Sequence, residues 1–220
     1  MIQEGDRIAV GVSGGKDSLT LLVALRRLMD FYPVRFELKA VTLALGIGEM
    51  DLSPVRKLCE DIGVEYIVED TYIGKIVFEA RQEKNPCSLC ANLRRGALNN
   101  AAVKLGCNKV ALAHNRDDVI ETLLLSTFYE GRIHSFSPVT YLDRKGVYVI
   151  RPLIYAEEKQ IKAFVRENSL QIVRNPCIAN GHTKRQYIKE LLIQLSADNR
   201  EIKNNIFGAI KRSGLDGWHD

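Results

Sequence analysis

The residues with the clearest chemistry are six consecutive ones near the start of the chain, Ser13–Ser18, which read SGGKDS. Two adjacent glycines let the backbone turn tightly and bring its N–H groups close to a ligand. Those groups, together with the positive end of a helix dipole, favour an anion such as phosphate. Lys16 adds a full charge, and the Ser13 and Ser18 hydroxyls can donate hydrogen bonds to phosphate oxygens. Asp17 repels an anion, so we interpret it as a helix cap or as a ligand of a divalent metal held on phosphates.

Three of the five cysteines form a second group: Cys87 and Cys90 in a CxxC pair, and Cys177 much later in the chain. Cys87 and Cys177 each follow an Asn-Pro dipeptide, which indicates that both thiols are presented from a rigid bend. Three thiolates make an incomplete zinc site, which His182 can complete, or they hold an iron–sulfur cluster with one iron left free. Spacing alone favours neither, and a CxxC by itself also fits a redox pair or an accidental buried pair.

A third group is the run Ala113–Asp118 (AHNRDD), which Glu121 follows one helical turn later. In a functional interpretation, one of Asp117 and Asp118 binds Mg²⁺ on a triphosphate, and His114 lies beside the nucleotide. In a purely structural interpretation, both carboxylates lie at a helix start because the helix dipole favours negative charge there.

These groups need elements that bring them together, and the pattern alternates β-branched runs with longer helical ones. It predicts strands at 7–13, 36–43, 65–69 and 109–114, and helices at 19–31, 54–62, 91–105 and 117–129. A turn over DRKG joins 139–142 to 147–150, and helices at 157–168, 183–195 and 200–212 follow. The alternation predicts an α/β fold, a parallel sheet with helices on both faces, followed by a helical C-terminal region. Loops beginning at Ser13, Gly46 and His114 then share the ligand-binding edge, beyond the carboxyl ends of the strands.

The composition and net charge exclude several classes of protein. The 220 residues, 46% hydrophobic and 26% charged, predict one substantial core rather than a disordered chain, a collagen-like repeat or a disulfide-rich mini-protein. A net charge of +4 tolerates a polyanionic partner without requiring one. With five cysteines and no signal-like segment, we expect no disulfide framework, and Cys59 and Cys107 are expected to be core thiols. No apolar run approaches the roughly 20 residues of a membrane span, so we expect no membrane and a cytoplasmic location.

The ordered motifs resemble a known family. The common P-loop template fails, because Val10 stands at its first glycine and Asp17 follows Lys16, but SGGKDS resembles the SGGxDS motif of the PP-loop ATP pyrophosphatases. SGGKDS, PCSLCANLRRG, AHNRDDVIETLLL, VIRPL and NPC, in that order, resemble the TtcA family of tRNA thiolases over nearly the whole chain. That family is understood to activate the C2 oxygen of a tRNA pyrimidine, usually cytidine 32, with ATP and to replace it with sulfur.

The resemblance implies a PP-loop/HUP-like, Rossmann-like domain over residues 1–155 and a helical region over 156–220 that carries the third cluster cysteine. It implies three cofactors, ATP, Mg²⁺ and a [4Fe-4S] cluster, and it favours the cluster over zinc for Cys87, Cys90 and Cys177. The residues implied to bind the nucleotide are Ser13, Gly14, Gly15, Lys16, Asp17, Ser18, His114 and Asp118. The residues implied to be catalytic are Cys87, Cys90, Cys177, Lys16 and Asp17.

The implied partners are tRNA and a sulfur donor, either a cysteine desulfurase or free sulfide, and a homodimer is expected because family members are often dimers. Arg94 and Arg95 follow the CxxC and can bring RNA to the cluster, and Arg151 either contacts phosphate or forms a surface salt bridge. A basic surface on the last helices is expected from Lys184, Arg185, Lys189, Lys211 and Arg212.

Two rival functions stay open from the sequence. A PP-loop ligase that uses ammonia or an amino acid needs the phosphate loop, Ser13–Ser18, but not three clustered cysteines. A zinc-stabilised nucleotide- or RNA-binding module needs the cysteines but no turnover.

Overall fold

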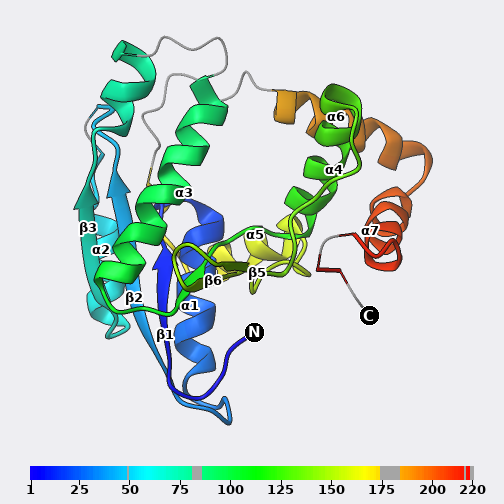
Figure 1. Cartoon of the computed structure of the whole chain (residues 1–220). Coiled ribbons are helices and arrows are strands. Elements are labelled where there is room, and N and C mark those ends of the chain that lie inside the picture. The colour runs from blue at the N-terminus through cyan, green and yellow to red at the C-terminus, as the bar shows by residue number, and fades with distance from the viewer. Residues whose placement is uncertain (49, 81–85, 174–183, 216, 219–220) are drawn as a thin grey trace.

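The computed structural model describes residues 1–48, 50–80, 86–173, 184–215 and 217–218 (Figure 1). Within these ranges six strands form one sheet, in the order β3-β2-β1-β4-β6-β5. The strands are β1 Asp6–Gly11, β2 Phe36–Ala44, β3 Glu65–Asp70, β4 Lys109–Ala111, β5 Val139–Leu142 and β6 Val147–Ile150. Neighbouring strands are parallel except for the β5–β6 hairpin, which is antiparallel. The α/β class with a mostly parallel sheet is therefore confirmed.

The helices connect and cover this sheet. They are α1 Lys16–Leu28, α2 Ser53–Asp61, α3 Pro86–Lys104, α4 Arg116–Glu130, α5 Glu158–Glu167, α6 Lys184–Asp198 and α7 Ile202–Arg212, with a π-helix, η1, at Lys75–Ala80. The sequence pattern predicted all of them except η1. No helix in the described ranges is long and apolar enough to cross a bilayer.

Two hydrophobic cores lie on the two faces of the sheet. Ile8 and Val10 of β1 pack with Leu22 of α1 and Val55 of α2, whereas the intervening residue, Ala9, packs on the other face with α3. This alternation follows from the period of two in a strand. The central strand is thus buried on both sides, as expected for a parallel sheet covered by helices on both faces.

A third core joins the last helices to the sheet domain. Ile120 of α4 packs with Ile188 and Leu192 of α6, Phe207 of α7, and Trp218. In Figure 1 these helices stand together on the side of the molecule away from β3. The region after residue 155 therefore shares a core with α4, and the boundary between residues 155 and 156 stays a prediction.

Three local differences from the sequence prediction matter for the site. Helix α3 begins at Pro86 rather than 91, so the CxxC pair lies in its first turn. Strands β1 and β4 end at Gly11 and Ala111, which leaves longer loops after each strand. Helix α1 begins at Lys16 with Gly15 as its N-cap, so Asp17 lies in the first turn and its interpretation as a helix cap is wrong.

A buried ion pair fixes the edge of the sheet opposite to these loops. Lys109 Nζ lies 2.6 Å from Asp6 Oδ2, and both side chains are almost fully buried. Burial opposes the charge on Asp6, but hydrogen bonds from Lys109, the Gln3 N–H and Asn108 outweigh it and lower the pKa of the carboxyl. The pair therefore holds β1 and β4 side by side, with its charges fully partnered.

We expect Lys109→Met to lower the free energy of unfolding by about 3 kcal/mol, because it leaves Asp6 buried without its main partner. The matched control is Lys104→Met, since Lys104 pairs with Glu69 at the surface, and its loss should stay below about 1 kcal/mol. Urea unfolding of both variants measures the difference. Equal losses would contradict a structural role for the buried pair.

Candidate active site

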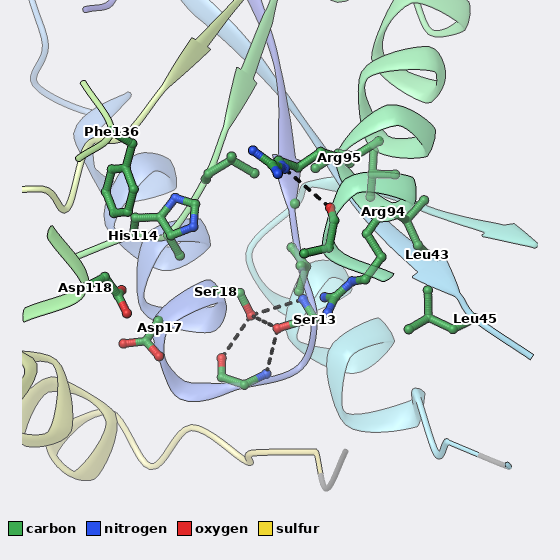
Figure 2. A pocket seen from close by; sticks show the side chains of 18 of the residues that line it. Ser13, Asp17, Ser18, Leu43, Leu45, Arg94, Arg95, His114, Asp118 and Phe136 are labelled. Atoms are coloured by element: carbon green, nitrogen blue, oxygen red, sulfur yellow. Dashed lines mark hydrogen bonds between the residues drawn. The ribbon is translucent and has the colours of Figure 1, made fainter. Parts of the chain in front are cut away.

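The loop after β1 is closed by its own two hydroxyls (Figure 2). Ser18 Oγ donates to Gly15 O at 2.9 Å and accepts from the Ser13 N–H at 3.1 Å, and the two hydroxyl oxygens are 3.2 Å apart. Ser13 Oγ also accepts a long hydrogen bond from the Gly15 N–H. The loop therefore holds its shape before any ligand arrives, with the start of α1 at the cavity.

Gly14 lies against Val173, a residue far along the sequence. Its φ of +77° lies in the left-handed region, and a Cβ there would stand 2.8 Å from Val173 Cβ. Val173 N donates to Gly14 O at 2.9 Å. Only glycine fits this turn, and it lets the chain that follows α5 lie directly on the loop.

Lys16 is held between two carboxylates. Its Nζ lies 2.7 Å from Asp17 Oδ2 and 3.0 Å from Glu158 Oε1, at the start of α5. Burial disfavours the charge on Lys16, but Asp17 and Glu158 outweigh it and raise its pKa. Burial likewise disfavours the charge on Glu158, yet Lys16, Lys189 and Lys162 lower its pKa to about 2. Lys16 is thus charged and fixed beside the loop.

The ion pairs continue from α5 to α4 and α6. Lys189 of α6 lies 3.6 Å from both Glu158 and the buried Glu121. Arg185 of α6 lies 3.1 Å from Glu121 and 3.5 Å from Asp118. Arg185 and Lys189, two residues of the expected basic surface, are therefore paired with carboxylates of α4 and α5, although both side chains stay partly exposed.

The two aspartates that begin α4 have different surroundings. Asp117 accepts from the Glu158 N–H at 2.8 Å and from Lys203 Nζ at 2.7 Å, which ties three helices together. Asp118 lines the cavity, forms a capping box with Asn115, and has a pKa raised by burial and by the nearby charge of Asp17. Asn115 also donates to Asp17 at 3.1 Å, so it links the two carboxylates that face the cavity.

Asp17 and Asp118 have the donor chemistry of a Mg²⁺ site, because carboxylate oxygens are ligands that this ion prefers. No group of three His, Cys, Asp or Glu side chains in the described ranges gathers around one point. Two carboxylates leave most of an octahedral shell to phosphate oxygens and water, which is the usual division of ligands around a metal–nucleotide complex.

His114 and Arg151 form a buried polar wall with Phe136. The His114 and Phe136 ring centroids are 4.5 Å apart, and the Arg151 guanidinium lies 5.0 Å from the Phe136 centroid. Burial, reinforced by the charges of Arg151, Arg185 and Arg95, lowers the pKa of His114 to about 3. The imidazole is therefore neutral at pH 7.

Arg151 is 8% exposed and donates to Ser137 O at 2.6 Å and to Thr140 Oγ1 at 3.2 Å. Burial, together with the charge of Arg95, lowers its pKa to about 10. The interpretation of Arg151 as a surface salt bridge is wrong, because the guanidinium faces the cavity wall and bonds to a backbone carbonyl and a hydroxyl.

These parts enclose one cavity of about 910 Å³. Its lining includes the loop after β1, the end of β2 with the loop that follows, one side of α3 from Ala91 to Leu98, the start of α4, and residues between Glu130 and Phe136. Figure 2 shows Ser13 and Ser18 between Leu43 and Leu45 on one side and His114 and Phe136 on the other. The three loops expected at the carboxyl edge of the sheet, after β1, β2 and β4, thus meet at one cavity.

The CxxC pair stands next to this cavity on α3. Cys87 is exposed and Cys90 half-buried, and three positions of helix place them on one side of the first turn. The following turn carries Ala91, Arg94 and Arg95, which line the cavity. The donor set fits a thiolate-bound metal or cluster at a helix start. Cys177 and His182 lie outside the described residues.

The other two cysteines are core residues, as predicted. Cys59 and Cys107 are buried, and burial raises the pKa of the Cys59 thiol to about 11. Neither has the exposure or the thiolate character of a metal ligand.

Several residues of the site carried no signal in the sequence. Glu158 stands in a helical run without a motif, Phe136 in a loop, and Leu43 and Leu45 at the end of a strand. The rule that ligands bind beyond the carboxyl ends of parallel strands could have indicated Leu45. Nothing local in the sequence distinguishes Phe136 from the other aromatic residues of the chain.

Comparisons with known proteins agree with this geometry. A family model described as a PP-loop domain matches residues 2–196. The chain is 40% identical to the tRNA-cytidine(32) 2-sulfurtransferase of Geobacter sulfurreducens, over 96% of this chain and 83% of that protein. It is 42% identical to the protein of the same name from Pelobacter propionicus, over 96% and 79% of the two chains.

Among solved structures, the chain superposes on the U34-tRNA thiolase NcsA from Methanococcus maripaludis with its [4Fe-4S] cluster. The TM-score is 0.81 at 25% identity, over 98% of this chain and 74% of that one. An NH3-dependent NAD synthetase from Campylobacter jejuni aligns at a TM-score of 0.53 and 19% identity, over 96% and 83%, and shows the fold alone.

The buried neutral imidazole predicts a pH dependence of stability. The folded pKa of His114 lies below the unfolded value of 6.5, so the unfolded state binds more protons between pH 6.5 and 3. Stability is therefore lost as the pH falls below 6.5, at up to about 1.4 kcal/mol per pH unit. We expect the wild type to lose about 1–2 kcal/mol more than His114→Gln between pH 7 and 5 in urea unfolding. Parallel losses in the two proteins would show that His114 titrates normally.

Proposed function

The chain belongs to the PP-loop domain family and, within it, to the tRNA-cytidine(32) 2-sulfurtransferases, and we propose from this premise that it thiolates cytidine 32 of tRNA with ATP. The observation that carries the proposal is the course of α3. Cys87 and Cys90 are among its first five residues, and Ala91, Arg94 and Arg95 after them line the cavity beside the loop Ser13–Ser18. One helix thus connects a pair of thiols to an ATP site.

In this proposal Ser13–Ser18 hold the β- and γ-phosphates of ATP. The N–H groups at the start of α1 point toward the phosphates, and Lys16 neutralises charge that builds up on them. Asp17 and Asp118 hold Mg²⁺ on the triphosphate, with Asn115 keeping the two carboxylates apart at a fixed spacing. The closed hydroxyl network of the loop means that little reorganisation precedes binding.

Cys87, Cys90 and Cys177 are proposed to hold the [4Fe-4S] cluster. Val173, four positions before Cys177, lies on Gly14, and α6, which begins at Lys184, contributes Arg185 to the cavity lining. The described chain before Cys177 therefore lies against the loop after β1, and the described chain after it reaches the cavity, which supports the assignment of Cys177 as the third ligand. The bound cluster supplies an iron site that presents sulfide to the substrate.

The chemistry then proceeds in two displacements. The C2 oxygen of cytidine attacks the α-phosphorus, an O–P bond forms, and pyrophosphate leaves. Sulfide next attacks C2, the C2–O bond breaks, and that oxygen departs with AMP. Activation matters because a bare carbonyl oxygen is a very poor leaving group, whereas AMP is a good one. Lys16 and the loop amides stabilise the negative charge on the departing phosphates.

The proposal also includes the location of the enzyme, its sulfur donor and its oligomeric state. We place it in the cytoplasm with its tRNA substrate. A cysteine desulfurase or free sulfide serves as sulfur donor, and the enzyme works as a homodimer. Light scattering after size-exclusion chromatography tests the dimer.

The arrangement of Lys16 between two carboxylates predicts the outcome of a double-mutant cycle. We expect Lys16→Met to raise the Kd for ATP by about 10- to 100-fold, because Asp17 and Glu158 then face the phosphates without compensation. Adding Glu158→Gln should recover part of this loss. Isothermal titration calorimetry measures each Kd, with Lys159→Met at the surface as the control that leaves it unchanged. A double variant as weak as Lys16→Met would show that Glu158 does not face the bound phosphates.

The experiment that tests the function uses anaerobically reconstituted protein with ATP, sulfide and tRNA that carries an unmodified cytidine 32. We expect 2-thiocytidine in the digested tRNA, and bound iron and sulfide that Cys87→Ser loses together with the activity. The matched control is Cys107→Ala, which removes a buried thiol away from the cavity and should keep both. Full thiolation by Cys87→Ser, or a colourless wild-type protein that contains zinc, would contradict the proposal.

A further inference from the structure

The cavity opens to solvent between α3 and the end of α4. The charged residues that line it and are also exposed are Asp70, Arg94, Arg95, Glu130 and Arg132. Arg94 and Arg95 belong to α3, whereas Glu130 ends α4 and pairs with Arg132, whose Nε lies 2.7 Å from Glu130 Oε2. Figure 1 shows α3 standing apart from α4 and α6, which lie close together. In the proposed function, a nucleotide of the tRNA passes between these two sides to reach the phosphate loop.

The end of α4 and the start of α6 present exposed aromatic rings beside this opening. Phe128, Tyr129 and Tyr187 are 55%, 43% and 55% exposed, and we call these three residues the aromatic rim. Phe128 and Tyr129 directly precede Glu130, which lines the cavity. The two helices share the third core, and Lys184, one turn before Tyr187, has its Nζ 4.2 Å from the centroid of the Tyr129 ring. Folding thus brings together rings that lie far apart in the sequence.

A group of exposed rings at a cavity opening differs from the single exposed apolar residues of an ordinary protein surface. Single residues need no explanation, whereas a gathered apolar patch with polar residues around it marks a binding surface. The Lys184 ammonium over the Tyr129 ring places a cation within the aromatic rim. Exposed rings next to cations suit unpaired nucleic acid, because its bases stack on the rings and its phosphates pair with the cations.

Charge and position favour RNA over a second copy of the chain as the occupant of the aromatic rim. Lys184 lies at the rim itself, and Arg94 and Arg95 lie across the opening on α3. An RNA strand that runs over the opening therefore meets cations on both sides, and its phosphates require such neighbours. A folded protein seated on the rim would also cover Glu130 and obstruct the way into the cavity. RNA needs that way open, because one of its own nucleotides enters.

We propose that the aromatic rim stacks the unpaired bases next to the target cytidine, while Arg94 and Arg95 across the opening contact phosphates of the same RNA strand. This inference rests on the proposed function. Cytidine 32 belongs to the anticodon loop of tRNA, whose bases are not paired with a second strand, so its neighbours are available for stacking. Stacking tolerates any base, because every base has a flat face. The rim therefore supplies affinity for an unpaired loop and does not read its sequence.

A double variant of the aromatic rim tests the stacking without turnover. Tyr129→Ala combined with Tyr187→Ala should raise the Kd for an anticodon stem-loop RNA at least about tenfold in fluorescence anisotropy. Tyr129→Phe combined with Tyr187→Phe keeps both rings and should bind like the wild type. The matched control is Phe31→Ala, which removes an exposed ring beyond the end of α1 and should leave the Kd unchanged. If the double alanine variant binds the stem-loop as tightly as the wild type, or loses affinity for ATP to the same extent, the proposal fails.

The salt dependence of binding separates stacking from contacts with phosphate. Arg94→Gln should lower the slope of log Kd against log salt concentration by about one, whereas the double alanine variant should keep the wild-type slope. A lower slope in the double alanine variant would show the loss of an ionic contact and contradict stacking.

Two further measurements separate this inference from its neighbours. If light scattering shows that the double alanine variant changes oligomeric state while its Kd for the stem-loop stays unchanged, the aromatic rim is an interface between copies and the proposal is overturned. A wild-type protein that binds the stem-loop as expected, with the loss in the double alanine variant, but forms no 2-thiocytidine contradicts the proposed reaction and leaves the aromatic rim standing as an RNA-binding surface.

Discussion

The site depends on the order of the parallel strands. β1 and β4 are neighbours, and the chain leaves β1 toward β2 on one side and leaves β4 toward β6 on the other. At such a switch point the loops after the two strands diverge and leave a crevice at the carboxyl edge of the sheet. The phosphate loop follows β1, and His114 with the start of α4 follows β4. The pairing of β1 with β4 therefore places both the phosphate loop and the residues at the start of α4. The buried Lys109–Asp6 ion pair holds these two strands together at the opposite edge of the sheet.

Charged side chains of α1, α4, α5 and α6 beside the cavity compensate one another. Lys16, Glu158, Lys189, Glu121, Arg185 and Asp118 alternate in sign along one connected set of ion pairs. Because Glu121 and Asp118 are largely buried, removing any one cation leaves a carboxylate that burial penalises. The same set joins the phosphate loop to α6, the helix that follows the segment of Cys177. In the proposed function, ATP phosphates that bind Lys16 therefore act on a network that extends to α6.

The sequence predicted the helices and strands and the three loops that line the cavity, because these depend on local pattern. The period of two in β1 and the glycines of Ser13–Ser18 are readable from neighbouring residues alone. The roles of Asp17, Arg151 and Arg185 were not, since each depends on what a distant element brings to it. Of the two interpretations of Asp17, the helix cap is wrong because Gly15 is the N-cap of α1, and the metal ligand stays a prediction. Arg185 was assigned to a surface because charge is usually solvated, and only packing of α6 on α4 turns it inward.

Phe136 shows how the last part of the chain takes part in the site without contributing a motif. The Trp218 indole is 3% exposed, packs edge-to-face against Phe207 and Tyr155, and donates to the carbonyl of Phe136. The core of α4, α6 and α7 thus fixes the position of an aromatic ring in the cavity through one backbone hydrogen bond. A loop with only solvent behind it could not hold this ring in one place in the cavity. The C-terminal helices are therefore part of the active-site architecture, in addition to any role in presenting the third cysteine.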